Sequence, residues 1–154
     1  MKSQGIRILD KKIGIGLAAF TEILIEIKNE NSFFWSILYL DITGTLGQEW
    51  PNPTFEEIND SKNGFPVDWK DLNLLANKIE QVIDITVLGC KNKNNLQRYE
   101  VEQEMYETCD IVIQMVDSSY WEVFSNDAQL IDRLTEKFKQ TQFLETDFLE
   151  KMRK

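Results

Sequence analysis

Carboxylates are the side chains of this sequence with the widest chemical reach. Four glutamates fall between residues 100 and 107, and Asp41, Asp110 and Asp117 stand near the ends of apolar runs. Carboxylates can act as general acids or bases, and they can ligate divalent cations. If residues 96–108 are helical, three of the glutamates (Glu100, Glu104 and Glu107) share one side of that helix. The stretch lacks the spacing and glycine of an EF-hand, which favours a solvated helix face over a metal site.

Histidine is absent from the chain. No Ser-His or Cys-His nucleophile pair can therefore form, and no histidine-based zinc site. The two cysteines, Cys90 and Cys109, flank a predicted inter-strand loop and cannot complete a tetrahedral zinc site by themselves. The Gly14-Ile15-Gly16 segment lacks the other residues of a phosphate-binding loop. We expect no resident metal or cofactor.

The charge of the chain bears on its partners. The formal net charge is −9, and residues 91–95 (KNKNN) form a local positive cluster too short for a nucleic-acid site. This balance argues against nucleic acid as a partner and is compatible with a basic protein partner or with simple solubility. The apolar run at residues 13–27 is too short and too charged to cross a membrane, and no cleavage site follows it. We expect a cytoplasmic protein with reduced cysteines.

Hydrophobic periodicity predicts an α+β fold of one domain, residues 1–154, with a frayed tail at residues 150–154. It indicates a mostly antiparallel sheet of about five strands with about three helices packed on it. The predicted strands are residues 6–9, 33–42, 85–89, 111–116 and 120–124, and the predicted helices are residues 16–28, 68–83 and 127–139.

The stretch from residue 109 to residue 138 carries the clearest local signals. A strand at residues 111–116 is apolar on both faces except for Gln114, which needs a hydrogen-bonding partner if it is buried. In the following strand, alternation places Glu122 on one face and Trp121 on the other. Asn126 is then predicted to cap a helix. A hairpin followed by a helix is a unit that can bury a common core.

Residues 43–67 are the least regular stretch and contain all three prolines. A loop of this length inside a domain is unusual and is often functional. Aromatic side chains beside carboxylates suit a protein-binding edge, whereas rings that fold back onto the core are the alternative. The predicted contact residues are Trp50, Phe55, Glu56, Glu57 and Phe65.

Two segments resemble an uncharacterised family of small Gram-positive bacterial proteins. They are Phe33-Phe34-Trp35-Ser36-Ile37, and Tyr106-Glu107-Thr108-Cys109-Asp110 running into IVIQMVDSSYWEVFSNDAQLI. The resemblance covers the N-terminal third and residues 106–138. Its members are of similar length and are known only as a domain of unknown function, so no activity or site residue carries over. The resemblance implies a bacterial cytosolic setting.

Two functions remain open from the sequence. The first is a non-catalytic protein-binding module, either an adaptor or an immunity-type inhibitor of a basic protein, which uses the contact residues in 43–67. The second is a carboxylate-only, metal-assisted hydrolase that uses Asp110, Asp117 or the group from Glu100 to Glu107. The absence of histidine and of a catalytic motif favours the binding module.

Overall fold

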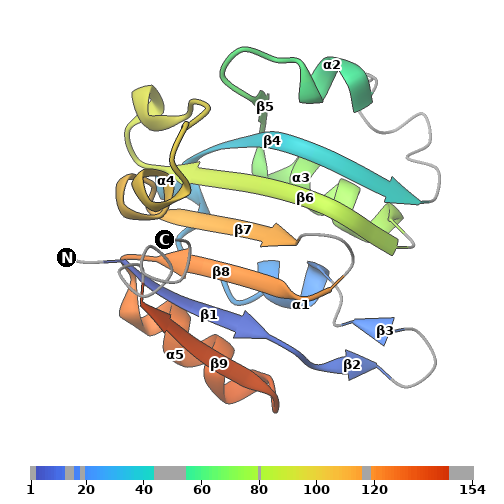
Figure 1. Ribbon diagram of the computed structural model, residues 1–154, viewed down its shortest axis with the longest axis vertical. Helices are drawn as coiled ribbons and strands as arrows, with labels where there is room; N and C mark the ends of the chain where they lie inside the picture. The colour runs from blue at the N-terminus through green and yellow to red at the C-terminus, as the bar shows by residue number, and fades with distance from the viewer. Residues whose placement is uncertain are drawn as a thin grey trace.

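A computed structural model of the protein describes residues 3–12, 16–17, 20–43, 55–79, 81–115 and 119–145. Within them, seven strands form an antiparallel sheet in the order β5-β4-β6-β7-β8-β1-β9, and β2 and β3 form a separate ribbon (Figure 1). The strands are β1 (Gln4–Ile8), β2 (Lys11–Lys12), β3 (Gly16–Leu17), β4 (Phe34–Thr43), β5 (Phe65–Val67), β6 (Gln81–Cys90), β7 (Ile111–Met115), β8 (Trp121–Ser125) and β9 (Thr141–Glu145). The helices are α1 (Phe20–Leu24), α2 (Phe55–Asn59), α3 (Trp69–Lys78), α4 (Glu102–Thr108) and α5 (Ala128–Lys137), with short 3-10 turns at Glu30–Ser32 and Lys93–Asn95.

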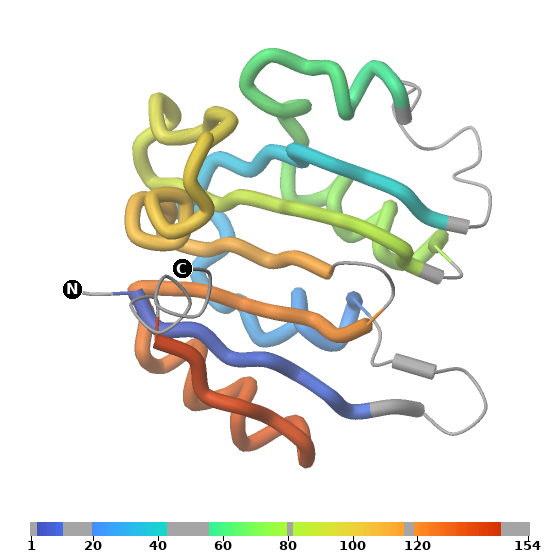
Figure 2. The backbone as a smooth tube through the Cα atoms, viewed as in Figure 1, coloured from blue at the N-terminus to red at the C-terminus, as the bar shows by residue number. Residues whose placement is uncertain are grey.

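The N-terminal strand, β1, is the last but one strand of the sheet, next to the edge strand β9. β1 lies between β8 and β9 and pairs antiparallel with both, so the two ends of the described chain meet in adjacent strands (Figure 2). At the opposite edge, β5 pairs only with residues 35–37 of β4. Asn59 of α2 pairs with the backbone of β4 farther along, because its side chain accepts from Leu40 N and donates to Leu40 O.

One face of the sheet, here called the first face, is covered by α1, α3 and α5, which lie behind the strands in Figure 1. Each central strand sends alternate apolar side chains to this face, as expected for a face that is buried against helices. Helix α5 is tied to the end of α1, since Arg133 donates to Glu26 O and Lys137 forms an ion pair with Glu26 at 3.0 Å. The largest core cluster of the protein occupies this face.

The opposite face, here called the second face, is covered at one end by α4 and the segment before it. A smaller core forms there around Phe124, whose ring stacks on Tyr106 with centroids 3.8 Å apart. The Phe124 ring crosses β1 at Gly5, where an added Cβ would come within 2.5 Å of it. Any larger residue at this position would displace the ring.

The α+β class and the antiparallel sheet agree with the prediction, but the sheet has seven strands and the described chain has five helices. The prediction had no strand at β5 or β9. β5 is only three residues long and contains Pro66, which weakens any strand signal. β9 is recruited by pairing with a strand at the far end of the chain, which local patterning does not encode.

Three local predictions were wrong. Of the helix expected at residues 16–28, the structure has only α1. β-Branched residues follow Leu24, and the chain turns there through hydrogen bonds from Glu26 N and Ile27 N to carbonyls three residues earlier. The helix expected at 68–83 ends at Lys78, since the later apolar residues belong to β6. The cap of α5 is Asp127, which accepts from Gln129 N, rather than Asn126. None of the described helices is long and apolar enough to cross a lipid bilayer.

Candidate functional site

A single row of polar side chains crosses the second face, with one residue from each of six strands. Cross-strand register places the members directly opposite one another, from β4 at one end to β9 at the other. In spatial order, this polar row is Tyr39, Thr86, Gln114, Glu122, Arg7 and Gln142. The apolar second core lies on one side of the row, between it and α4.

Hydrogen bonds connect the centre of the polar row. Arg7 donates to Oε2 of Glu122 from Nε at 3.2 Å and from Nη2 at 3.0 Å. The Gln114 amide donates to Oε1 of Glu122 at 3.2 Å and to the Tyr106 hydroxyl at 2.6 Å. Tyr106 in turn donates to Glu102 of α4 at 2.8 Å. The predicted need of Gln114 for a partner is thus met twice.

The burial of this network indicates that it stabilises the sheet. Glu122 is 6% exposed, whereas the Arg7 side chain is 25% exposed and its guanidinium lies 4.3 Å from the centre of the Tyr120 ring. A carboxylate taken out of water needs a cation and hydrogen-bond donors, and Glu122 has both. Its two oxygens are occupied by described side chains, so we assign it no catalytic role.

Beyond the polar row, the second face is open among the described residues. Tyr39 is 42% exposed, and Thr86 opposite it is half-buried. The next cross-strand pair is Asp41 and Asp84, two half-buried carboxylates directly opposite each other. Like charges in this position repel. The open part of the face therefore presents an exposed tyrosine beside a concentration of negative charge.

More carboxylates lie at two sides of the second face: on α2 beside the edge of β4, and on α4 across the second core and the polar row. Glu100, Glu104 and Glu107 are exposed on and before α4, and Glu56, Glu57 and Asp60 are exposed on and after α2. Arg98 holds the two segments together, because its guanidinium donates to three backbone carbonyls at the end of α2, those of Ile58, Asn59 and Ser61. We call the open part of the second face, together with the carboxylates of these two segments, the acidic face.

The sequence explains why the acidic face is so one-sided. Residues 29–61 contain six acidic residues and residues 99–132 contain nine, and neither stretch contains a lysine or arginine. The open end of β4, all of α2, all of α4, β7 and β8 come from these stretches. Arg7 and Arg98 are both committed to hydrogen bonds within the protein, and the exposed Lys62 directly follows the first stretch.

The structure brings some of the predicted contact residues together. Glu56 and Glu57 are exposed on α2 and belong to the acidic face. Phe65 lies on β5, half-buried and packed against the first core. Trp50 and the Phe55 side chain lie outside the described part of the chain. The role of this set in binding stays a prediction.

The predicted metal ligands are dispersed where they are described. Asp110 accepts from Lys91 N and from the Asn126 amide, so it joins two loops. Glu100 precedes α4 and does not share its helical face with Glu104 and Glu107, while Asp117 is outside the described residues. Among the residues that the structure describes, no three histidine, cysteine, aspartate or glutamate side chains are placed to hold a metal ion.

Cys90 and Cys109 lie together, fully buried in the second core, as free thiols. A hydrogen bond between them raises the pKa of Cys90 and lowers the pKa of Cys109, whose sulfur also lies 3.9 Å from the Tyr99 hydroxyl. Burial raises the pKa of that phenol. Cys109 is therefore the more acidic thiol of the pair.

Sequence reasoning missed the polar row apart from Gln114. The available signal was a single charged residue inside each of two short apolar strands, Arg7 in β1 and Glu122 in β8. A buried charge in a strand needs a partner of opposite sign. That rule points to this pair once β1 and β8 are known to be neighbours.

A family model described as "Protein of unknown function (DUF2691)" matches residues 12–154. The chain belongs to this family. The resemblance to an uncharacterised family is thereby confirmed, and the DUF2691 match also runs through the middle of the chain, beyond the two regions that the sequence segments covered. Neither the curated proteins nor the solved structures include a match to this chain. The description of this family assigns no function to its members.

Proposed function

We propose that this protein is a non-catalytic module that binds a basic protein on its acidic face. The observation that carries the proposal is the composition of that face: exposed carboxylates from α2, α4 and the open sheet, drawn from two stretches without a lysine or arginine. A surface of one sign steers a partner of the opposite sign and raises its association rate.

The open sheet supplies a contact surface of the kind that partner proteins use. Tyr39 stands exposed at the end of the polar row, and tyrosine is enriched at protein interfaces because it combines a large apolar ring with a hydroxyl. Glu56 and Glu57, two of the predicted contact residues, extend the same surface along α2. An adaptor and an immunity-type inhibitor would both use such a face.

The carboxylate-only hydrolase remains the second candidate, but no described arrangement of ligands favours it. Of the carboxylates named for this function, Asp110 already accepts hydrogen bonds from Lys91 N and the Asn126 amide. A binding module therefore explains the acidic face better than the hydrolase does, because binding needs no metal site.

The proposal is tested by affinity purification from native-host lysate at low salt, with mass spectrometry of the captured proteins. The variant Asp41→Asn/Glu104→Gln removes two charges from the acidic face, and Asp132→Asn/Glu136→Gln removes two exposed charges from α5 as the matched control. We expect a basic protein with the wild type and the control, and its loss with the acidic-face variant. We also expect its loss near 1 M salt, where the screening length falls to about 3 Å. Equal recovery with both variants contradicts the proposal.

A further inference from the structure

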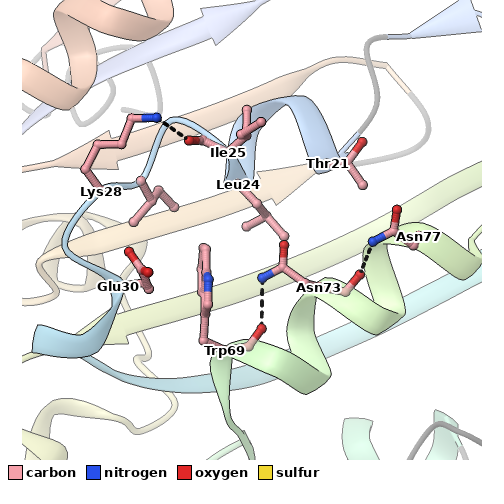
Figure 3. A pocket seen from close by; sticks show the side chains of 9 residues that line it. Thr21, Leu24, Ile25, Lys28, Glu30, Trp69, Asn73 and Asn77 are labelled. Carbon is pink, nitrogen blue, oxygen red and sulfur yellow. Dashed lines mark hydrogen bonds between the residues drawn. The ribbon is translucent and has the colours of Figure 1, made fainter.

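A groove of about 510 Å³ lies on the other side of the molecule, between α1 and α3 (Figure 3). The buried side of α3 carries Leu72, Leu75 and Ala76. The side that lines the groove carries Trp69, Asn73 and Asn77, which are spaced four residues apart. These three side chains stand one helical turn apart in a line.

The two asparagines present hydrogen-bond acceptors to this groove. The Asn73 amide nitrogen donates to Trp69 O and the Asn77 amide nitrogen donates to Asn73 O, both at 2.8 Å. Each nitrogen is thereby fixed on the helix backbone, so each Oδ1 is turned outward (Figure 3). Neither Oδ1 accepts a hydrogen bond from the described part of the chain.

The spacing of these acceptors suits an extended polypeptide. Residues four apart on an α-helix are separated by about 6 Å along its axis. In an extended chain, alternate N–H groups point the same way and recur every 6.4–6.8 Å, or roughly 6.6 Å. Asn73 and Asn77 can therefore accept from alternate N–H groups of one extended segment.

The end of the groove at Trp69 favours a cation. One face of the indole packs near Trp35, with ring centroids 5.1 Å apart, and the ring also lines the groove. Glu30 lines the groove beside it (Figure 3). An indole face next to a carboxylate is a favourable site for lysine or arginine. Lys28, also in the lining, is turned to the opposite wall, where its ammonium donates to Ile25 O.

We propose that this groove binds an extended peptide segment that places a lysine or arginine side chain on Trp69. Asn73 and Asn77 accept from its backbone, and Ile25, which is 61% exposed on the α1 wall, covers an apolar neighbour in the peptide. The proposal goes beyond the acidic face and does not depend on it. With a basic protein also bound on the acidic face, the protein would hold two partners at once, as an adaptor does.

The test is an NMR titration of ¹⁵N-labelled protein with the capped peptide Ser-Thr-Val-Arg-Val-Thr-Ser, alongside versions with citrulline or glutamate in place of arginine. We expect saturable shifts of the Trp69 indole N–H and of the Asn73 and Asn77 side-chain amides. The glutamate peptide should bind at least about tenfold more weakly, since Glu30 repels it and the cation–π contact is lost.

Variants separate binding from folding. Asn73→Ala/Asn77→Ala should weaken the arginine peptide about tenfold, because two acceptors are lost from a helix face that tolerates alanine. Glu30→Gln should weaken it several-fold, whereas Asn63→Ala, an exposed asparagine outside the groove, should leave it unchanged. Equal affinity for the arginine and glutamate peptides overturns the proposal, as does the absence of shifts at millimolar peptide. Shifts confined to Tyr39 and Thr86 place the peptide on the acidic face and overturn it too.

Discussion

The first face of the sheet is packed against α1, α3 and α5, whereas the second face carries only α4 and its preceding segment among the described residues. The same strands serve both faces. On the first face, every strand position near the centre is apolar, and on the second face a polar row replaces one whole line of apolar side chains. Face-specific composition shows which side of a sheet is buried by its own helices and which side is available to something else.

The largest loss of stability should come from placing a polar side chain of the second-face type on the first face. Ile113 is fully buried on the first face, next in sequence to Gln114 on the second. Ile113→Gln should destabilise the protein by about 4 kcal/mol, because it removes an apolar contact and buries an amide among apolar side chains. Urea unfolding measures this loss, and Ile113→Val should lose about 1 kcal/mol. A loss below about 2 kcal/mol for the glutamine variant would show that the first face also tolerates a buried amide.

The ion pair of the polar row gives the next effect. Arg7→Met leaves Glu122 buried without its cation, and we expect a loss of about 2–3 kcal/mol, below the fully buried limit because Arg7 is partly exposed. The double variant Arg7→Met/Glu122→Leu should regain at least half of that loss in urea unfolding. A double variant no more stable than the single one would mean that the charge of Glu122 is not the cause.

A smaller effect tests the hydrogen bonds alone. Gln114→Leu removes the donor to both Glu122 and Tyr106, and we expect a loss of about 1–2 kcal/mol. Gln142→Leu, at the exposed end of the same row, should change the stability by less than about 0.5 kcal/mol. Thermal and urea unfolding measure both, and equal losses would argue that position in the row does not matter.

On the open part of the face, one substitution should stabilise the protein. Asp41→Asn removes the repulsion between Asp41 and Asp84 and should add about 0.3 kcal/mol at low salt, a gain that shrinks as salt screens the pair. The control is Asp132→Asn on α5. Destabilisation by Asp41→Asn would show that the Asp41 carboxylate supports folding, and would contradict the expected repulsion between Asp41 and Asp84.

The smallest expected effect is that of divalent cations. Mg²⁺, Mn²⁺ and Ca²⁺ at millimolar concentration should leave the melting temperature unchanged, because only a cation that binds the native state raises it. A rise of several degrees with one of them would instead support the carboxylate-only hydrolase. Repeating the scan with Asp117→Asn and with Glu104→Gln would then locate the ligands.

Local patterning predicted the parts of the fold that local interactions determine. The alternation that puts Trp121 on the first face and Glu122 on the second is correct, as is the need of Gln114 for partners. Local patterning could not predict which strands that are distant in the sequence pair with one another. β1 lies between β8 and β9 through contacts more than a hundred residues apart, as in the Arg7–Glu122 bond, and no local signal encodes that position.

The candidate site divides in the same way. Glu56 and Glu57 could be predicted as contact residues because they lie in the long, proline-containing irregular stretch of residues 43–67. The acidic face as a whole could not, since it forms only when Arg98 joins α2 to the segment before α4 and when β4 pairs with β6. The groove between α1 and α3 likewise depends on how two helices pack, although Trp69, Asn73 and Asn77 already show their spacing in the sequence.

Binding at the acidic face is tested most directly by an NMR titration of the ¹⁵N-labelled protein with the basic protein recovered by low-salt purification. We expect shifts at Tyr39, Asp41, Asp84 and Thr86 and along α2 and α4, and their loss at high salt. Shifts confined to α5 and β9, or shifts that persist at high salt, would contradict it, as would the failure of any basic protein to bind.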